Sequence, residues 1–248
     1  MKIEKRVAIV TGGARGIGYA TAVSLAAHGV VPVIADINIE TAEKSAETIR
    51  QSGSDAFALK VDLGNTDEIT GMIDAVVARY GRLDILVNNA GILTNTQYDS
   101  VTGQEWDRMM NINLKGVFFA SREAIRPMKA QGWGRIISIS SMAGRSGGIS
   151  AGSAYVAAKA AIIGITRHLA KKVAADGITV NAVAPGTIES DMLKDFTQAD
   201  LEAIYKTIPM GRLGKPEEIA ETIAFLASDA AAFMTGAILD VNGGNYMA

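Results

Sequence analysis

The chain of 248 residues contains no cysteine and only two histidines, His28 and His168. The absence of cysteine excludes disulfide bonds, thiolate nucleophiles and cysteine-bound zinc or iron–sulfur clusters. The two histidines lie far apart in the sequence and lack a ligand-like context, so we interpret them as solvated or helix-end residues. We therefore expect neither a metal site nor a serine–histidine catalytic triad.

The two signs of charge nearly balance, because 24 Lys and Arg stand against 26 Asp and Glu, for a formal net charge of −2. Such a balance provides no field to attract nucleic-acid phosphates or an anionic membrane. No apolar run approaches the ~20 residues that a membrane span needs. The segment Met1–Arg6 has neither the apolar region nor the cleavage site of a signal peptide. We expect a cytoplasmic protein that binds neither nucleic acid nor membrane.

Short β-branched runs alternate with longer amphipathic stretches along the chain, and several runs are apolar on both faces, as in a buried parallel sheet. This alternation predicts one domain over residues 1–248, with a Rossmann-type, doubly wound α/β fold. We expect a seven-stranded, mostly parallel sheet with helices on both faces. The expected strands are Val7–Val10, Val31–Ala35, Ala56–Val61, Ile85–Asn88, Arg135–Ser140, Thr179–Ala184 and Ile238–Val241. The expected helices are Ile17–Ala27, Ile39–Gln51, Asp67–Tyr80, Leu114–Ala130, Ser153–Ala175 and Pro216–Ala227.

Residues from Gly186 to about Lys215 interrupt this alternation with a long connection of weak helical patterning. A connection of this length inside a compact domain is usually a binding element. We predict a substrate lid at about 186–215.

The first expected strand leads into the turn Thr11-Gly-Gly-Ala-Arg-Gly-Ile-Gly18, and a helix follows. Glycines in such a turn let the backbone approach a pyrophosphate, while the helix N-terminus faces the negative charge. A glycine triple is a weak signal by itself, and its place between a strand and a helix strengthens it. The predicted dinucleotide-binding residues here are Gly12, Arg15, Gly16, Ile17 and Gly18.

The second expected strand ends at Asp36. A carboxylate there can accept hydrogen bonds from ribose hydroxyls and repel a 2′-phosphate. Arg15 is the opposing signal, because a guanidinium in the turn could reach such a phosphate. We give the acid more weight, since a carboxylate beside a phosphate is costly in a partly desolvated site. NAD(H) is therefore expected over NADP(H), although Asp36 could also cap the next helix.

Polar residues also follow the third and fourth expected strands. Asp62 and Leu63 could hold the adenine, and Asn88-Asn-Ala-Gly91 lies where ligands gather in open α/β sheets. Asn and Gly also favour turns, so a purely local role stays open for them. Cofactor contacts are predicted for Asp62, Leu63, Asn89, Ala90 and Gly91.

Tyr155 and Lys159 lie four residues apart in a stretch that reads as helix. That spacing puts the phenol and the ammonium on one helical face. A nearby cation favours the phenolate, so we expect a lowered pKa for Tyr155. Tyr155 is then a candidate general acid/base near neutral pH.

Together these motifs resemble the short-chain dehydrogenase/reductase family. The matching segments are Thr11-Gly-x-x-x-Gly-x-Gly18, Asn88-Asn-Ala-Gly91, Asn113, Ser141, Tyr155-x-x-x-Lys159 and Pro185-Gly186. Among family members, Ile208-Pro-Met-Gly-Arg-Leu-Gly214 and Val241-Asn-Gly-Gly244 are similar to segments of bacterial 3-oxoacyl-[acyl-carrier-protein] reductases.

The resemblance implies a catalytic set of Asn113, Ser141, Tyr155 and Lys159. In this set Tyr155 exchanges a proton with the substrate oxygen and Ser141 donates a hydrogen bond to the same oxygen. Lys159 holds the nicotinamide ribose and keeps Tyr155 acidic, while Asn113 binds a water that links Lys159 to solvent. Ser140 and Asn111 compete for two of these roles, and the resemblance favours Ser141 and Asn113. The remaining implied cofactor contacts are Pro185, Gly186, Ile188 and Ser190, together with Tyr155 and Lys159.

The implied reaction is hydride transfer between the cofactor and a secondary alcohol or ketone. Gly132 and Asp176 occupy two places where carrier-protein reductases would have docking arginines, although Lys171, Lys172 and Arg135 could compensate. With the acid at Asp36, this favours a small polyol, hydroxy ketone, sugar or similar small-molecule substrate. A 3-oxoacyl-[acyl-carrier-protein] reductase is the alternative, and a catalytically silent dinucleotide-binding scaffold is the remote alternative.

The expected Ser153–Ala175 helix carries small residues around more than one face. A second face that packs closely indicates subunit contact. The family resemblance implies a homotetramer formed through this helix and its neighbour.

Overall fold

The computed structural model describes residues 6–148, 151–190 and 197–247. They form one domain around a seven-stranded sheet of order β3-β2-β1-β4-β5-β6-β7. Every neighbouring pair of strands is parallel, which confirms the predicted fold. The strands are β1 (Val7–Thr11), β2 (Val31–Asp36), β3 (Phe57–Lys60), β4 (Ile85–Asn88), β5 (Gly134–Ile139), β6 (Ile178–Pro185) and β7 (Ile238–Val241).

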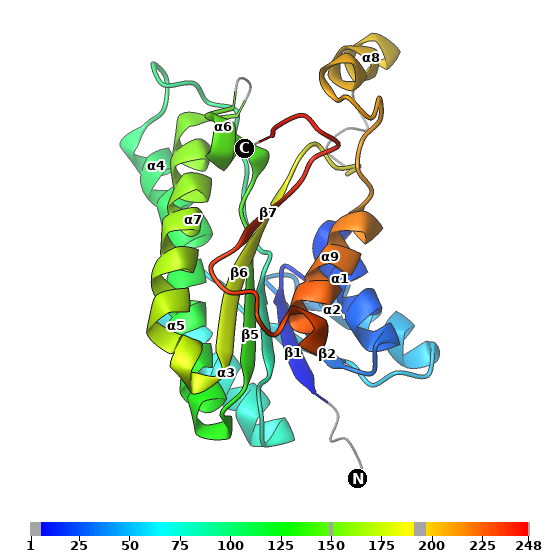
Figure 1. The fold of residues 1–248 in the computed structure, drawn as a ribbon, viewed down its shortest axis with the longest axis vertical. Helices are drawn as coiled ribbons and strands as arrows, with labels where there is room; N and C mark the ends of the chain where they lie inside the picture. The colour runs from blue at the N-terminus through cyan, green and yellow to red at the C-terminus, as the bar shows by residue number, and fades with distance from the viewer. Residues whose placement is uncertain (1–5, 149–150, 191–196, 248) are drawn as a thin grey trace.

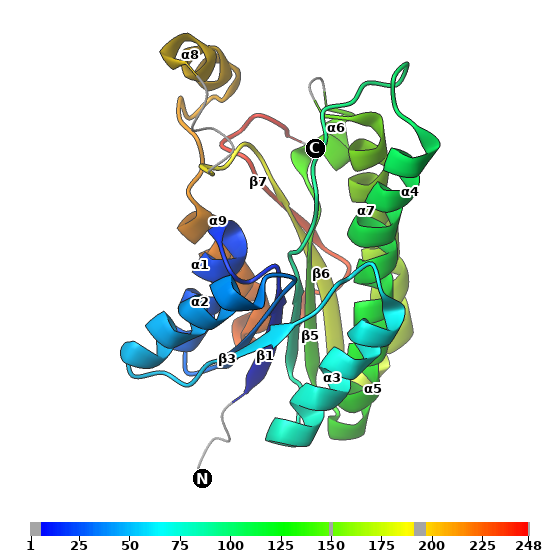
Figure 2. The same cartoon turned by 180° about the vertical axis from the view of Figure 1, so that it is seen from behind.

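Helices cover both faces of the sheet (Figures 1 and 2). One face carries α1 (Gly16–Ala27), α2 (Ile39–Gln51) and α9 (Pro216–Ala227). The other carries α3 (Thr66–Tyr80), α5 (Val117–Gln131) and α7 (Ser153–Val173). The remaining helices are α4 (Gly103–Met110), the π-helix η1 (Asn111–Gly116), α6 (Met142–Ser146), the 3₁₀ turns η2 (Ala174–Asp176) and η4 (Asp229–Ala231), and α8 (Gln198–Thr207).

The apolar runs of the central strands are explained by burial on both faces. Along β1, Ala8 and Val10 pack in the cluster under α1, α2 and α9, whereas Val7 and Ile9 pack in the cluster under α3, α5 and α7. Successive side chains of a strand point to opposite faces, so neither face tolerates a polar residue here.

The order of the sheet reverses between β1 and β4, which lie side by side. In open α/β sheets this switch point leaves a crevice at the carboxyl ends of the strands. Thr11 joins the two strand ends, because its Oγ1 accepts hydrogen bonds of 3.1 Å from both Asn89 N and Ala90 N. The same hydroxyl donates to Val87 O at 3.2 Å, so the floor of the crevice is rigid.

Three helices that the sequence did not predict appear around the carboxyl edge of the sheet: α4, α6 and α8. The helix α8 lies inside the predicted lid and projects beyond the sheet (Figure 1). Residues 191–196 of that predicted lid lie outside the described residues. Within the part of the chain that the structure describes, no helix is long and apolar enough to cross a membrane.

Candidate active site

Tyr155 and Lys159 lie in the first two turns of α7, next to the carboxyl end of β5. Lys159 Nζ lies 5.7 Å from the centre of the Tyr155 ring, which confirms that the phenol and the ammonium share one helical face. The lysine side chain is buried, and its Nζ donates a hydrogen bond of 2.7 Å to Ile139 O. The two groups that the sequence singled out therefore meet at one end of the sheet.

The predicted direction of the Tyr155 pKa is wrong for the protein described here. Burial raises the pKa of Tyr155, and a hydrogen bond with Ser141 only partly opposes that rise. The nearby ammonium does not reverse the rise, and Lys159 Nζ donates its hydrogen bond to Ile139 O rather than to the phenol. Burial also lowers the pKa of Lys159 to about 8. Desolvation of both groups outweighs the attraction that the spacing alone implied.

The two serines that follow β5 make different contacts. Ser140 is buried and its Oγ donates a hydrogen bond of 2.8 Å to Lys159 O, so its hydroxyl is committed to the backbone. Ser141 caps α6, where its Oγ accepts a hydrogen bond of 3.1 Å from Ala143 N. The Ser141 hydroxyl also contacts the Tyr155 hydroxyl, as the prediction for the catalytic serine requires.

The two competing asparagines, Asn111 and Asn113, also make different contacts. Asn111 Nδ2 donates to Gly64 O at 3.0 Å, away from the tyrosine and lysine. Asn113 is fully buried and holds the backbone of Ile92, accepting from Ile92 N at 2.8 Å and donating to Ile92 O at 2.7 Å. A Cβ added to Gly91 would lie 3.2 Å from Asn113 Oδ1 and 3.6 Å from Lys159 Nζ. Asn113 and Lys159 therefore approach the same point of the site.

At Gly12 and Gly18 the glycine turn has no space for a side chain. A Cβ on Gly18 would lie 2.1 Å from Gly12 O, and one on Gly12 would lie 2.8 Å from Ala90 Cα. Arg15 and Gly16 are exposed, and Arg15 makes no side-chain cap on α1. The first N–H groups of a helix need a partner, and an anion can supply it. The turn fits the phosphates of a dinucleotide.

Asp36 is held beside this turn at the end of β2. Its Oδ2 accepts a hydrogen bond of 3.2 Å from Ala14 N, and its Oδ1 accepts one of 3.0 Å from Asn38 N. The alternative role as helix cap is wrong, because Asn38 is the residue that caps α2, through a 3.0 Å hydrogen bond from Thr41 N. The Asp36 carboxylate is thus fixed where a ribose next to the turn could be bound.

The other predicted cofactor residues lie along the same edge. Asp62 Oδ1 accepts from Gly64 N at 2.7 Å, and Leu63 is part of the core. Asn89 Nδ2 donates to Thr11 O and Gly12 O, both at 3.0 Å, so this side chain shapes the turn. Further along the edge, Pro185 ends β6, and Gly186 N donates a hydrogen bond of 3.0 Å to Val241 O of β7. Ile188 forms an isolated parallel bridge with Gly214, and Ser190 is exposed.

Sequence reasoning missed residues that act by contact rather than by motif. Thr11 was quoted as part of the turn, but its role in joining β1 to β4 depends on the sheet order. Gly144 has no motif that would single it out in the sequence. In the structure a Cβ on Gly144 would lie 2.6 Å from the carbonyl carbon of Lys159, so this glycine lets α6 pack directly on α7. The run of glycines between Ser141 and Tyr155 is the one available signal.

A doubly wound sheet with a glycine turn at its switch point, and a serine–tyrosine–lysine set at the same edge, defines a dinucleotide-binding α/β oxidoreductase. Comparison with known proteins agrees. The sequence profile of the family described as "Enoyl-(Acyl carrier protein) reductase" matches residues 12–245. The chain belongs to the short-chain dehydrogenase/reductase family, whose members act on carbonyl or CH–OH groups.

Curated relatives align over the whole chain. The 3-oxoacyl-[acyl-carrier-protein] reductase FabG of Pseudomonas aeruginosa is 42% identical, with 100% of both chains covered. That of Staphylococcus aureus is 44% identical, again with 100% of both covered. Among solved structures, gox2181 has a TM-score of 0.94 at 38% identity, covering 98% of this chain and 96% of its own. A variant of a Serratia marcescens short-chain dehydrogenase/reductase has a TM-score of 0.92 at 34% identity, covering 99% of each chain.

Proposed function

We propose that this enzyme reduces the 3-oxo group of an acyl thioester, using a nicotinamide cofactor. The observation that carries the proposal is the pair of hydroxyls, Ser141 and Tyr155, held together beside buried Lys159 at the glycine-turn edge. The substrate class is supported by the full-length relatives, which are named 3-oxoacyl-[acyl-carrier-protein] reductases. These relatives favour this substrate class over the polyol or sugar that the sequence alone favoured.

The proposed chemistry follows from what each side chain can donate. Tyr155 gives its proton to the substrate oxygen as that oxygen becomes a hydroxyl, and Ser141 donates a hydrogen bond that stabilises the developing charge. Lys159 would hold a ribose of the bound cofactor, and Asn113 would order a water that returns a proton through Lys159. The bound cofactor supplies the hydride. We assign the pyrophosphate to Gly12, Arg15, Gly16, Ile17 and Gly18, the adenine to Asp62 and Leu63, and the nicotinamide half to Asn89, Ala90, Gly91, Pro185, Gly186, Ile188 and Ser190.

The segment 186–215, with α8, is proposed as the substrate lid. It starts where β6 ends, at the same edge as the glycine turn, and α8 projects beyond that edge (Figure 1). A long segment in this place can close over a bound substrate and exclude water.

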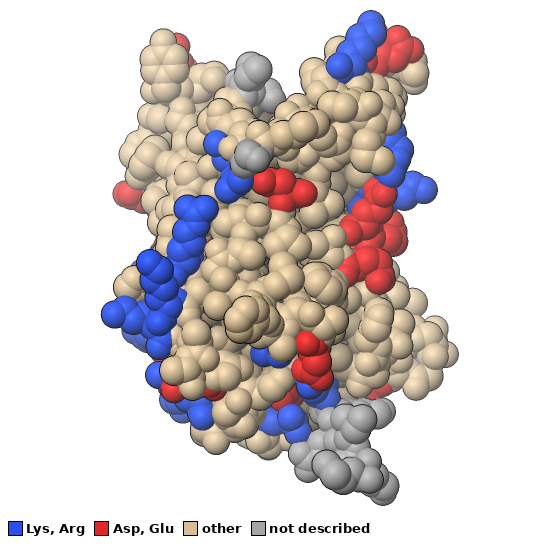
Figure 3. Space-filling model, viewed as in Figure 1, with Lys and Arg blue, Asp and Glu red and all other residues tan. Residues whose placement is uncertain are grey.

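A small secondary alcohol remains the second candidate, favoured by Gly132 and Asp176 in place of docking arginines. Two observations weaken it. Lys129 Nζ forms an ion pair of 2.8 Å with Asp176 Oδ2, so the carboxylate that would repel an acidic carrier is neutralised. Lysine and arginine side chains gather along the α7 side of the molecule (Figure 3). Lys171 and Lys172, in the last turn of α7, are exposed. An acidic carrier protein could dock on such a surface.

The substrate is tested by measuring initial rates with acetoacetyl thioesters and with a panel of polyols, sugars and hydroxy ketones, each with both cofactors. We expect the thioesters to give the highest kcat/KM. A polyol or sugar that is turned over with a higher kcat/KM than every thioester would make the second candidate the better one.

The cofactor preference is predicted from Asp36. The fixed carboxylate should accept ribose hydroxyl hydrogen bonds in NADH and repel the 2′-phosphate of NADPH. Loss of one or two charge-assisted hydrogen bonds, at about 1.5–3 kcal/mol each, should raise the Kd for NADH roughly 10-fold or more in Asp36→Ala. The same variant should bind NADPH more tightly than the wild type. Fluorescence titration measures both constants.

The control is Asp55→Ala, which removes an exposed carboxylate away from the turn and should leave both constants unchanged. A wild-type enzyme that binds NADPH more tightly than NADH would show that Arg15, rather than Asp36, decides the preference.

We further propose a homotetramer located in the cytoplasm. An open groove of about 420 Å³ lies between η1, α5 and α7, lined by apolar Met110, Leu114, Phe118, Phe119 and Ile165. An open groove lined by such partly buried apolar side chains is typical of a subunit contact. A monomer in sedimentation equilibrium would contradict the tetramer.

A further inference from the structure

The short helix α6, which begins directly after Ser141, is held from two sides by consecutive residues. Gly144 contacts the backbone of α7, where an added Cβ would lie 2.6 Å from the Lys159 carbonyl carbon. Arg145 extends to the edge strand β7, where its guanidinium donates a hydrogen bond of 3.0 Å from Nη2 to Asp240 Oδ2. The helix that Ser141 caps is thus fixed between α7 and β7.

The pair of Arg145 and Asp240 is largely removed from water. The side chains are only 14% and 20% exposed. Arg145 Nε and Asp240 Oδ1 are buried and have no hydrogen-bond partner among the described residues. An incompletely satisfied buried ion pair adds little to stability compared with apolar side chains of similar volume. Stability alone therefore gives no reason for this pair next to a catalytic serine.

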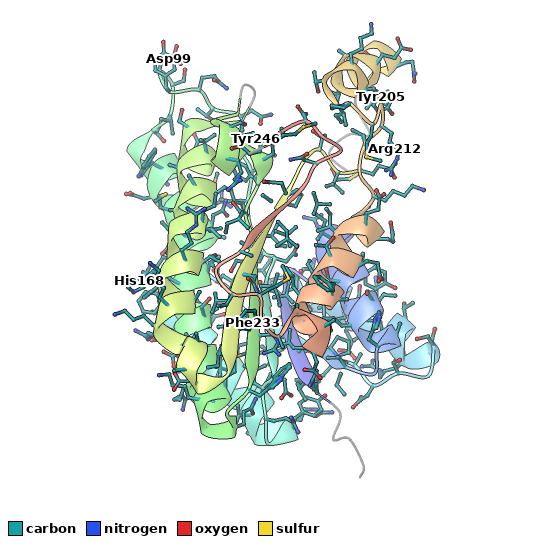
Figure 4. The ribbon with its side chains drawn as sticks, in the orientation of Figure 1. Asp99, His168, Tyr205, Arg212, Phe233 and Tyr246 are labelled. Carbon is teal, nitrogen blue, oxygen red and sulfur yellow. The ribbon has the colours of Figure 1, made fainter. Side chains whose placement is uncertain are left out.

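Arg145 also contacts the C-terminal segment, residues 242–247. Its guanidinium carbon lies 5.2 Å from the centre of the Tyr246 ring, a cation–π contact. The same segment contacts the connection that follows α8, because Met210 N donates to Gly243 O at 3.1 Å. Figure 4 shows Tyr246 near α6, with Tyr205 and Arg212 on the opposite side of this edge. The C-terminal segment therefore connects α6 to the predicted lid.

We propose that Arg145 is a positioning residue for Ser141, held in place by Asp240 and by Tyr246 of the C-terminal segment. The inference rests on the proposed function, in which Ser141 and Tyr155 act on one substrate oxygen. The guanidinium keeps α6 against β7, and α6 keeps the Ser141 hydroxyl within hydrogen-bond distance of Tyr155.

The test is Arg145→Met, which keeps most of the side-chain volume and removes the charge. A small displacement of Ser141 should lower kcat by roughly 10- to 100-fold and leave the Kd for NADH unchanged. The hydrogen bond from Ser141 lowers the Tyr155 pKa, so its loss should raise that pKa. Tyr155 must be protonated for carbonyl reduction, and activity falls as pH rises through its pKa. The basic limb of the pH–rate profile should therefore move to higher pH, as in Ser141→Ala, and Arg145→Lys should restore part of the change.

The matched control is Arg6→Met. Arg6 makes the same two kinds of contact, an ion pair of 2.9 Å with Asp229 and a cation–π contact of 4.0 Å with Trp133. It precedes β1, so it lies at the amino ends of the strands, whereas α6 lies at their carboxyl ends. This variant should lower the melting temperature without moving the pH profile. An Arg145→Met enzyme that keeps the wild-type kcat and pH profile would overturn the positioning role.

Two further variants keep the inference testable if Arg145→Met does not fold. Asp240→Asn keeps the shape of the partner and removes its charge, and Tyr246→Leu removes the cation–π contact. Each should move the basic limb in the same direction, and a wild-type profile in both would overturn the inference. A failure of the proposed function is distinguishable, because it would show as undiminished turnover in Tyr155→Phe. A failure of this inference alone would leave Tyr155→Phe inactive while Arg145→Met kept the wild-type kcat and pH profile.

Discussion

Replacing Tyr155 by phenylalanine is expected to lower kcat roughly 10²- to 10⁴-fold, the range that a positioned general acid contributes. The phenol lies against Ser141 and has a raised pKa, so it is fully protonated at neutral pH and is ready to donate in the direction of carbonyl reduction. Phenylalanine keeps the ring and its packing on α7. The Kd for NADH, measured by fluorescence titration, should change little, and single-turnover measurements should show the loss in the hydride-transfer step.

The control for this experiment is Tyr98→Phe, which removes a phenol hydroxyl from an exposed ring. It should retain wild-type kcat. If Tyr155→Phe kept turnover on the best substrate within a few-fold of wild type, another group would have to supply the proton and the assignment of Tyr155 would be wrong.

Lys159→Met is the second variant with a large expected effect, and it should act on both turnover and stability. Turnover should fall by a factor comparable to that of Tyr155→Phe, because the proposed contact to the ribose and the proton path through the ammonium are both lost. The stability should change in the opposite direction. Burial lowers the pKa of Lys159 from 10.5 to about 8, so the native state binds the proton less tightly than the unfolded state does.

The sign follows from proton linkage. Between about pH 8 and 10.5 the unfolded chain carries more protons than the native protein, so wild-type stability rises with pH across this window. Below pH 8 the full cost of the buried ammonium is present, and a shift of this size corresponds to about 3 kcal/mol. Lys159→Met avoids that cost but loses the hydrogen bond to Ile139 O, which contributes about 1 kcal/mol. It should therefore be more stable than wild type by about 2 kcal/mol at pH 7 in cofactor-free urea unfolding.

This advantage should shrink as the pH rises from 8 to 10. The control is Lys172→Met, which replaces an exposed lysine on the same helix. The stability of this variant should follow that of the wild type from pH 7 to pH 10. A Lys159→Met protein that is less stable than wild type at pH 7, with an unchanged pH dependence, would show that Lys159 carries no desolvation cost.

The fold could be predicted because its signals are local. Apolar runs such as Val31–Ala35 gave the strands within one or two residues, and the alternation with amphipathic stretches gave the parallel topology. The helices that were missed are α4 and α6, which are short, and α8, which follows an irregular connection. Their amphipathic patterns extend over at most three turns, and contacts with neighbouring elements rather than periodicity stabilise them.

In the candidate site, too, local features could be predicted from the sequence, whereas features that depend on distant contacts could not. The spacing of Tyr155 and Lys159 placed them correctly on one face, since helical geometry is local. The predicted direction of the Tyr155 pKa shift was wrong, because desolvation depends on what the rest of the chain packs around the phenol. Likewise, only the hydrogen bond from Ser140 Oγ to Lys159 O shows that this serine is occupied and that Ser141 is free to face the tyrosine.

The sequence by itself determined the parallel α/β architecture, the glycine turn between β1 and α1, and the placement of Tyr155 and Lys159 on one helical face. These depend on side-chain periodicity and on residues close together in the chain. Tertiary structure alone decided which serine and which asparagine face the tyrosine and lysine, in which direction burial shifts both pKa values, and that Arg145 reaches β7. Those properties depend on contacts between residues as far apart as Arg145 and Asp240, which have no period or spacing in the chain to reveal them.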